Sequence, residues 1–237
     1  MAFSASRAVL FDLDGTLADT APDLVGTLLE LRRRRGLGGL DEAELREHAT
    51  RGAIGLLEAG FKDIDGIEPS ELRQEFLDHY ADHLWVRSRA FPGVDAALAR
   101  LADAGLGLGV VTNKVEALAQ PVIERAGWIR RFGCLIGGDT LTRSKPDPAP
   151  VIEACRRLGV TPSEAVFVGD DRRDVLAGQA AGVRTVVARW GYLPSGEDGT
   201  TWGADAVIDR ADELDAFLGL PDRASVPGKT RRTYGQR

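Results

Sequence analysis

The sequence contains little cysteine and no long apolar run, and both scarcities exclude classes of protein. Its two cysteines, Cys134 and Cys155, are isolated, which argues against a disulfide framework and against a metal knuckle. No apolar stretch approaches the length that spans a membrane, and the N-terminus passes almost directly into a strand, leaving no room for a signal peptide. We therefore expect a cytoplasmic protein, in a reducing compartment, without a membrane partner.

Positive charge is not in excess either. The formal net charge is -6, which argues against general nucleic-acid binding because such binding requires a basic face. Most basic residues are arginines. We expect a retained lysine to mark a place where a guanidinium cannot substitute, and the four lysines are Lys62, Lys114, Lys145 and Lys229.

The most informative feature that is present is the segment of residues 7–16. Ala8–Phe11 has the length and branching of a buried parallel strand. Two carboxylates, Asp12 and Asp14, follow it, and Gly15-Thr16 then breaks the strand. Two acids at a strand end are costly unless a cation neutralises them, and a divalent cation at the carboxyl edge of a parallel sheet is the usual solution. This segment predicts an enzyme whose chemistry lies here.

Short apolar strands and amphipathic helices alternate from Leu106 onward. This alternation predicts a parallel sheet covered on both faces, and a chain of 237 residues fits one large domain or a core with a smaller inserted one. Strands are expected at Leu106–Thr112, Cys134–Ile136, Ala165–Gly169, Val183–Ala188 and Ala206–Ile208, and helices at Lys114–Gly127, Pro148–Leu158, Arg172–Ala181 and Glu213–Leu218.

The interval from Ala18 to about Ala90 interrupts this rhythm and contains no convincing strand. Thr20 and Pro22 are a helix start signal, and a leucine stripe follows at helical spacing. A second helix is expected around Leu72, Phe76, Tyr80 and Leu84. A helical module inserted after the first strand lies over the strand ends, where a lid belongs.

Three further polar clusters are predicted to lie at the edge of the same sheet. Thr112-Asn113 ends one strand, Ser144-Lys145-Pro146-Asp147-Pro148 precedes a helix, and Gly169-Asp170-Asp171 ends another strand, with Asp174 one turn later. Each cluster alone has an ordinary structural explanation as a cap or a turn. Together with Asp12 and Asp14, in this order, they supply every part that phosphoryl transfer through a covalent aspartate requires.

The residue types assign the roles. Asp12 is the expected nucleophile, and Asp14 the acid and base for the leaving alcohol and the attacking water. Mg²⁺ is the expected cofactor. Lys145 offsets the acids and binds a phosphoryl oxygen, to which the Thr112 hydroxyl and Asn113 also donate. The expected metal ligands are a carboxylate oxygen of Asp12, the backbone carbonyl of Asp14 and Asp170, and Asp171 and Asp174 orient metal-bound waters or hold Lys145.

The four motifs together resemble the signature of the haloacid dehalogenase superfamily, over nearly the whole chain to about Leu218. The resemblance implies an α/β fold with a Rossmann-like parallel sheet core and an inserted helical cap of the C1 type. It implies a hydrolase core over residues 1–17 and 91–220 and a cap over residues 18–90. The basic residues 221–237 are expected to form a flexible tail.

Within the superfamily, Asp14 separates the subclasses, because dehalogenases and phosphonatases lack this second acid. Hydrolysis of a phosphate monoester is therefore favoured, and the chain looks like the phosphoglycolate phosphatase group. Stretches at Gly169–Asp174, Arg189–Tyr192 and Trp202–Asp205 resemble more narrowly the N-acetylmuramic acid 6-phosphate phosphatases. The expected partner is a small phosphorylated metabolite, and the expected assembly a monomer or weak homodimer.

The cap is expected to determine the substrate specificity. The glycine-rich segment Ala49–Gly55 lies between helices and resembles the substrate-specificity loop of C1 caps, which makes Arg51 and Gly52 candidate substrate ligands. Arg51 suits a substrate carboxylate, although a solvated helix-end cation is an equal alternative. His79 and His83 have metal-binding spacing without a third ligand, so a surface or packing role is expected.

Two other functions remain open on the sequence. A sugar phosphomutase of the same superfamily returns the phosphoryl group to the sugar. A phospho-accepting signalling domain also surrounds a strand-end aspartate with acids, threonine and lysine, but needs neither an inserted cap nor a leaving-group acid. A catalytically silent binding protein is disfavoured by the intact polar set.

Overall fold

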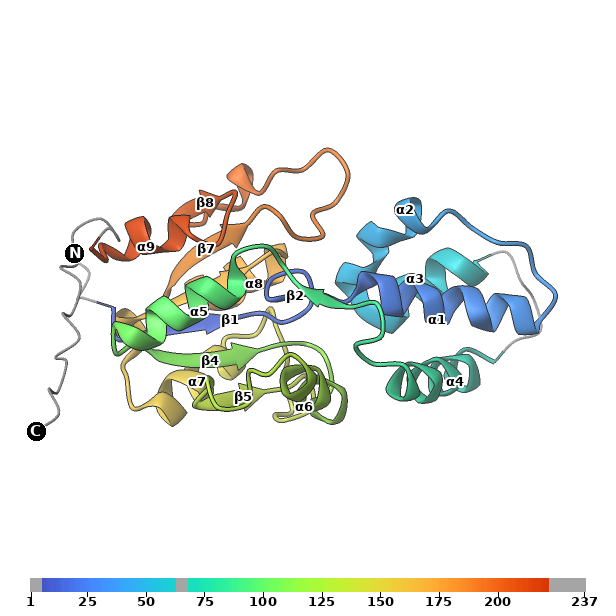
Figure 1. The fold of residues 1–237 in the computed structure, drawn as a ribbon, viewed down its shortest axis with the longest axis horizontal. Coiled ribbons are helices and arrows are strands. Elements are labelled where there is room, and N and C mark those ends of the chain that lie inside the picture. Colours follow the sequence, from blue (N-terminus) through green and yellow to red (C-terminus); the bar gives the residue numbers. More distant parts are fainter. Residues whose placement is uncertain (1–5, 63–67, 222–237) are drawn as a thin grey trace, which may run out of the picture.

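The computed structural model describes residues 6–62 and 68–221. The predicted tail therefore lies outside the described residues, apart from its first residue. The sequence also predicts a turn at residues 63–69, and most of that segment lies outside the described residues too. Figure 1 shows two lobes, one built on a sheet and one built from helices α1 to α4.

The first lobe contains six parallel strands in the order β5-β4-β1-β6-β7-β8. The first strand, β1, is central, and all four of its residues are buried, as expected for a strand that is covered on both faces. The predicted α/β class with a Rossmann-like parallel sheet is thereby confirmed. The strands are β1 (Ala8–Phe11), β4 (Gly107–Val111), β5 (Cys134–Ile136), β6 (Ala165–Gly169), β7 (Arg184–Ala188) and β8 (Ala206–Ile208).

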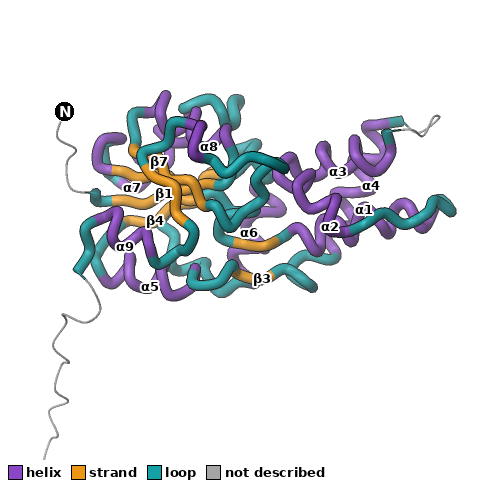
Figure 2. The backbone as a smooth tube through the Cα atoms, turned by 90° about the horizontal axis from the view of Figure 1, so that it is seen from above, coloured by secondary structure: helices purple, strands orange, loops and turns teal. Residues whose placement is uncertain are grey.

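Alternate residues of β1 enter two different hydrophobic clusters, because successive side chains of a strand point to opposite faces. Val9 and Phe11 pack in the cluster that includes residues of α5, α6 and α9, and Ala8 and Leu10 pack with α7 and α8. Figure 2 shows α7 and α8 on one side of the sheet and α5 and α9 on the other. The helices are α5 (Val94–Asp103), α6 (Glu116–Arg125), α7 (Ala149–Leu158), α8 (Arg172–Ala181) and α9 (Glu213–Leu218).

Most predicted bounds in this lobe agree with the structure to within one or two residues. Helix α5, which follows the return of the chain from the helical lobe, was not predicted from the sequence. The helix expected from Lys114 begins at Glu116 instead, because residues 112–115 form the turn that follows β4.

The second lobe contains α1 (Ala21–Arg34), α2 (Glu42–Leu45), a 3-10 helix (Arg46–Arg51), α3 (Gly52–Phe61) and α4 (Pro69–Asp82). The predicted apolar stripes face its interior, and Leu28 and Phe76 are fully buried. The segment expected as a glycine-rich loop is helical on both sides of Gly52, whose φ of 57° turns the chain between two helices. The loop prediction was wrong because one glycine is sufficient for this turn.

The interval between Ala18 and Ala90 does contain strands, contrary to prediction. β2 (Ala18–Asp19) pairs antiparallel with β3 (Arg89–Ala90) where the chain passes between the lobes. Two residues are too few to give an alternating pattern, so the sequence carries no signal for them. We propose that this pair is the boundary between the core and the cap, close to the expected divisions after residues 17 and 90.

No helix in the described part of the chain is long and apolar enough to cross a membrane. Both cysteines are free and buried, Cys134 against β4 and α7 and Cys155 within α7.

Candidate active site

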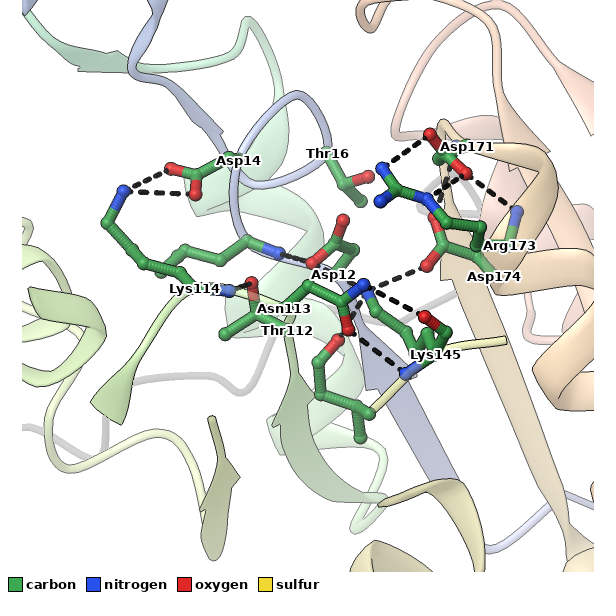
Figure 3. Close-up of polar contacts among 12 residues, drawn as sticks. Asp12, Asp14, Thr16, Thr112, Asn113, Lys114, Lys145, Asp171, Arg173 and Asp174 are labelled. Carbon is green, nitrogen blue, oxygen red and sulfur yellow. Dashed lines mark hydrogen bonds and ion pairs between the residues drawn. The ribbon is translucent and has the colours of Figure 1, made fainter. Parts of the chain in front are cut away.

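The carboxyl ends of β1, β4 and β6 meet at one edge of the sheet and bring the predicted polar residues together. Phe11 is in register with Val110 on one side and with Val168 on the other. The residues that follow these strands, including Asp12, Thr112 and Asp170, therefore converge from distant parts of the sequence, as Figure 3 shows for Asp12 and Thr112.

Lys145 lies at the centre of this edge. Its ammonium is 2.9 Å from Asp12 Oδ1, 2.7 Å from Asp174 Oδ1, and donates to the Val111 carbonyl at 2.9 Å. Three acceptors match the three donors of an ammonium. Burial opposes the charge, but Asp12 and Asp174 outweigh it and raise the pKa of Lys145 above its usual range. It was expected that Asp171 or Asp174 would hold this lysine, and Asp174 does so.

Asp170 is buried between two glycines. A Cβ on Gly15, whose φ is 87°, would lie 2.1 Å from Asp170 Oδ2, and one on Gly191 would lie 2.2 Å from the Asp170 Cβ. Thr16 Oγ1 donates to Asp170 at 2.7 Å and the Tyr192 N–H at 2.8 Å. Burial and the charges of the neighbouring acids raise the pKa of Asp170 well above its usual value.

Carboxylate oxygens of Asp12, Asp170 and Asp174 lie within 4.8 Å of one another. Hard oxygen donors of this kind suit Mg²⁺. Burial, and after it the charges of Asp12 and Asp174, raise the pKa of Asp170, and a bound cation would offset both effects. The residues therefore fit a divalent cation. Asp174 joins this cluster in addition to its bond to Lys145.

Asp14 lies in the same loop but its side chain turns away from Asp12 (Figure 3). Both of its oxygens face the ammonium of Lys114, at 3.0 and 3.1 Å, and Thr20 Oγ1 donates to it at 2.6 Å. Lys114 also donates to Tyr80 Oη of the helical lobe at 3.1 Å. Asp14 outweighs the effect of burial and raises the pKa of Lys114 above its usual range, and burial raises the pKa of Tyr80 to about 12.

The predicted phosphate ligands Thr112 and Asn113 are also at the site. The Asn113 amide donates to the Lys145 carbonyl and accepts from the Lys145 N–H, both at 3.0 Å. In this state it fixes the Lys145 segment beside β4. Thr112 Oγ1 accepts from the Lys114 N–H at 3.2 Å. Its own O–H donates to none of the described residues, so it can donate to a phosphoryl oxygen.

Asp171 pairs with an arginine that the sequence analysis did not single out. Arg173 approaches both Asp171 oxygens, with Nε at 2.8 Å from one and Nη2 at 2.8 Å from the other. Nη2 also donates to the Thr50 carbonyl of the helical lobe at 2.8 Å. Burial raises the pKa of Asp171, but Arg173 outweighs it and lowers that pKa below its usual value.

A cavity with a water-accessible volume of about 140 Å³ lies between the lobes. Asp12, Asp14 and Lys145 line its core side. The predicted Arg51 and Gly52 line its other side, but the Arg51 guanidinium is paired with Glu58 at 2.6 Å and both side chains are more than half exposed. Apolar side chains form much of the remaining wall: Leu24, Ala53, Ile54, Phe76, Leu77, Val115 and Leu118.

The predicted histidine pair lies outside this cavity. His79 and His83 are stacked with ring centroids 4.1 Å apart on α4. Among the described residues, the three core aspartates are the one cluster with metal-binding geometry, and the histidines do not belong to it.

Comparison with known proteins gives the same family as the motifs. The family model described as haloacid dehalogenase-like hydrolase matches residues 9–188. The N-acetylmuramic acid 6-phosphate phosphatase of Pseudomonas aeruginosa is 44% identical over 219 residues, which cover 92% of this chain and 96% of the relative. A phosphoglycolate phosphatase of Xanthomonas campestris pv. campestris is 43% identical over 208 residues, or 88% and 94% of the two chains.

Solved structures agree with this assignment. A crystal structure described as a predicted phosphoglycolate phosphatase from Haemophilus somnus superposes with a TM-score of 0.82 at 26% identity. The match covers 91% of this chain and 99% of that protein. The resemblance stated from the sequence is thereby confirmed.

Proposed function

The chain belongs to the haloacid dehalogenase-like hydrolases and is a phosphoric monoester hydrolase, and on this premise we propose that it cleaves a small phosphate ester through an aspartyl-phosphate on Asp12. The observation that carries the proposal is the Asp12 carboxylate at the floor of the cavity. Its Oδ1 accepts from the Leu13 N–H at 2.7 Å and faces Lys145, which leaves the second oxygen to attack phosphorus.

In the first step a bond forms between Asp12 and phosphorus while the bond from phosphorus to the ester oxygen breaks. Asp14 gives its proton to the leaving oxygen, and then takes a proton from the water that cleaves the acyl phosphate. Inorganic phosphate and free Asp12 result. The Asp14 side chain has to leave Lys114 for these transfers, because in the state described here both of its oxygens face that ammonium.

We assign Asp12, Asp170 and the backbone carbonyl of Asp14 to Mg²⁺, with Asp174 beside them. When bound, the metal supplies electrostatic stabilisation of the phosphoryl oxygens. Lys145 stabilises charge on the same group, and the Thr112 hydroxyl donates to it. Asn113 acts by fixing Lys145.

We propose N-acetylmuramic acid 6-phosphate as the substrate, with phosphoglycolate as the alternative. Both esters carry a carboxylate. The apolar cap wall favours the larger ester, because its acetamido and lactyl methyl groups can cover apolar surface and phosphoglycolate has no such groups.

A panel of esters with Mg²⁺ tests this proposal. N-acetylmuramic acid 6-phosphate, phosphoglycolate and N-acetylglucosamine 6-phosphate are compared by phosphate release, and the sugar products are examined for isomers. We expect release from the muramic ester with the highest kcat/KM and no isomer, whereas an isomerised sugar phosphate would indicate a mutase. Strong preference for an ester without a carboxylate would contradict both substrate assignments.

Asp12→Asn is the matched variant, because it keeps the shape of the side chain and removes the nucleophile. We expect a loss of at least about 10³-fold in kcat with an unchanged melting temperature. Normal turnover by this variant would refute the aspartyl-phosphate.

A further inference from the structure

Arg173 is held at two points, one in each lobe. Two hydrogen bonds to the Asp171 carboxylate fix the guanidinium on the core. A third hydrogen bond goes to the carbonyl of Thr50, near the end of the 3-10 helix in the cap. Thr50 in turn donates from Oγ1 to the Tyr192 carbonyl at 2.6 Å. The arginine is therefore preorganised at the seam between the lobes, which lowers the entropic cost of binding a further group.

The remaining terminal nitrogen of Arg173, Nη1, makes no hydrogen bond to any residue that the structure describes. Arg173 lines the same cavity as Asp12 and Lys145. In Figure 3 the guanidinium lies on the Asp12 side of Asp171. Two N–H donors of a fixed cation are thus available to a ligand in the cavity.

Other cations of the cavity wall are committed elsewhere or less restrained. Lys145 is occupied by two aspartates and a carbonyl. Lys114 donates to Tyr80 and, until Asp14 turns to the proton transfers, to Asp14. Arg51 is paired with Glu58 on the exposed side of the cap. Arg73 of α4 also lines the cavity, but its side chain is exposed and no contact in the described part of the chain fixes it. Of these five cations, Arg173 combines partial burial, a fixed orientation and unused donors.

We propose that Arg173 is a specificity-determining residue that binds the carboxylate of the substrate through Nη1. This inference rests on the proposed function, because it requires a phosphate ester that also carries a carboxylate. Asp171 acts as a positioning residue that holds the guanidinium. Nη2 bonds to the Thr50 carbonyl of the cap at the same time. The Arg173 side chain therefore links a bound carboxylate to the cap in the position it has here.

Paired substrates test the proposal. N-acetylmuramic acid 6-phosphate is compared with N-acetylglucosamine 6-phosphate, which lacks the lactyl carboxylate, and phosphoglycolate is compared with ethyl phosphate. For Arg173→Met we expect kcat/KM to fall about 10- to 100-fold for the carboxylated member of each pair, mainly through KM, and to change less than about threefold for the other member. Arg173→Lys, which keeps the charge without the fork, is expected to restore part of the loss.

Arg172→Met is the matched control, since Arg172 is the exposed neighbour on the same helix. We expect it to leave both members of each pair unchanged. Asp171→Asn is expected to lower kcat/KM for the carboxylated esters selectively, but by less than Arg173→Met does, because it weakens the ion pair that orients Arg173.

If Arg173→Met lowered kcat/KM equally for both members of a pair, the proposal would be overturned. Arg173 would then be only a ligand of the phosphoryl group or a structural contact. Melting temperatures separate misfolding from this outcome, and Arg173→Lys replaces the methionine variant if that variant does not fold. The proposed phosphatase activity is tested independently with the esters that lack a carboxylate. We expect the wild type to release phosphate from them and Asp12→Asn to release none.

Discussion

Burial of the site's carboxylates, together with the repulsion between them, gives the protein a specific response to pH. Burial and the neighbouring acids raise the pKa of Asp170 well above 3.8, and burial raises that of Asp174 to about 7. A carboxyl with a raised pKa in the folded state binds protons more tightly there than in the unfolded chain. Its contribution to stability is therefore present at low pH and is lost as pH rises through the folded pKa.

We predict that Mg²⁺ raises the melting temperature by an increment that grows from pH 5 to pH 8, roughly the range over which Asp174, with its pKa of about 7, loses its proton. Below this range protons compete with the metal for the same oxygens. Thermal denaturation with and without Mg²⁺ at each pH measures the increment. Asp170→Asn should remove most of it, and an increment that shrinks as pH rises would contradict the prediction.

Which residues reach the site was predictable where the backbone alone decides it. Asp12, Asp170 and Thr112 directly follow strands, so a parallel sheet brings them together. Lys114 and Arg173 were not predicted as site residues, because their partners Tyr80 and Thr50 belong to the other lobe. The scarcity of lysine was the one signal that could have drawn attention to Lys114.

At the scale of elements, the chain crosses between the lobes twice. Asp23 of α1, which follows the first crossing, forms hydrogen bonds with residues 86–88, which precede the second. Its buried carboxylate accepts from the backbone N–H groups of Val86, Arg87 and Ser88 at 2.7–3.0 Å, and from the Ser88 hydroxyl. Three backbone donors and one hydroxyl therefore depend on a single side chain.

We predict that Asp23→Ala lowers the free energy of unfolding by about 3 kcal/mol, since it leaves these donors without their acceptor. Asp23→Asn keeps one acceptor oxygen and should cost less. Urea denaturation measures both, with Asp103→Ala, an exposed residue of α5, expected to change stability by less than about 0.5 kcal/mol. Equal stability of Asp23→Ala and the control would show that water replaces the carboxylate.

Most helices and strands were predictable from their patterns, but the two-residue strands β2 and β3 and the helix α5 were not. The leucine stripe of α1 and the strands of the sheet have enough residues for their periods to be visible. Thr20 gave the start of α1 correctly, yet its hydroxyl donates to Asp14 and does not cap the helix. The local sequence signal thus located the start of the helix, while the tertiary structure determined what the Thr20 side chain contacts.

At the scale of the whole molecule, the alternation of strands and helices was sufficient to predict the fold class, because a parallel sheet must be covered on both faces. The way the lobes meet was not predictable. Contacts across the seam join residues over 100 positions apart, such as Thr50 to Tyr192 and Arg173 to Thr50. Such contacts leave no period or spacing in the sequence.

The two cysteines report on the stability of the sheet lobe as a unit. Cys155 is 1% exposed and belongs, with Cys134, to the cluster that joins β1 to α7 and α8. Burial raises the pKa of each thiol to about 11, so the reactive thiolate is scarce at neutral pH and shielded from reagents.

We therefore predict that an aromatic disulfide reagent labels Cys155 of a Cys134→Ala variant only as fast as the lobe unfolds. The dependence of the labelling rate on urea then equals that of global unfolding measured by circular dichroism, because exposing α7 dismantles the cluster it shares with β1. The fully denatured variant provides the unprotected rate. Rapid labelling without urea would mean that α7 separates locally from the sheet while the remaining strands stay folded, and the lobe would then contain more than one cooperative unit.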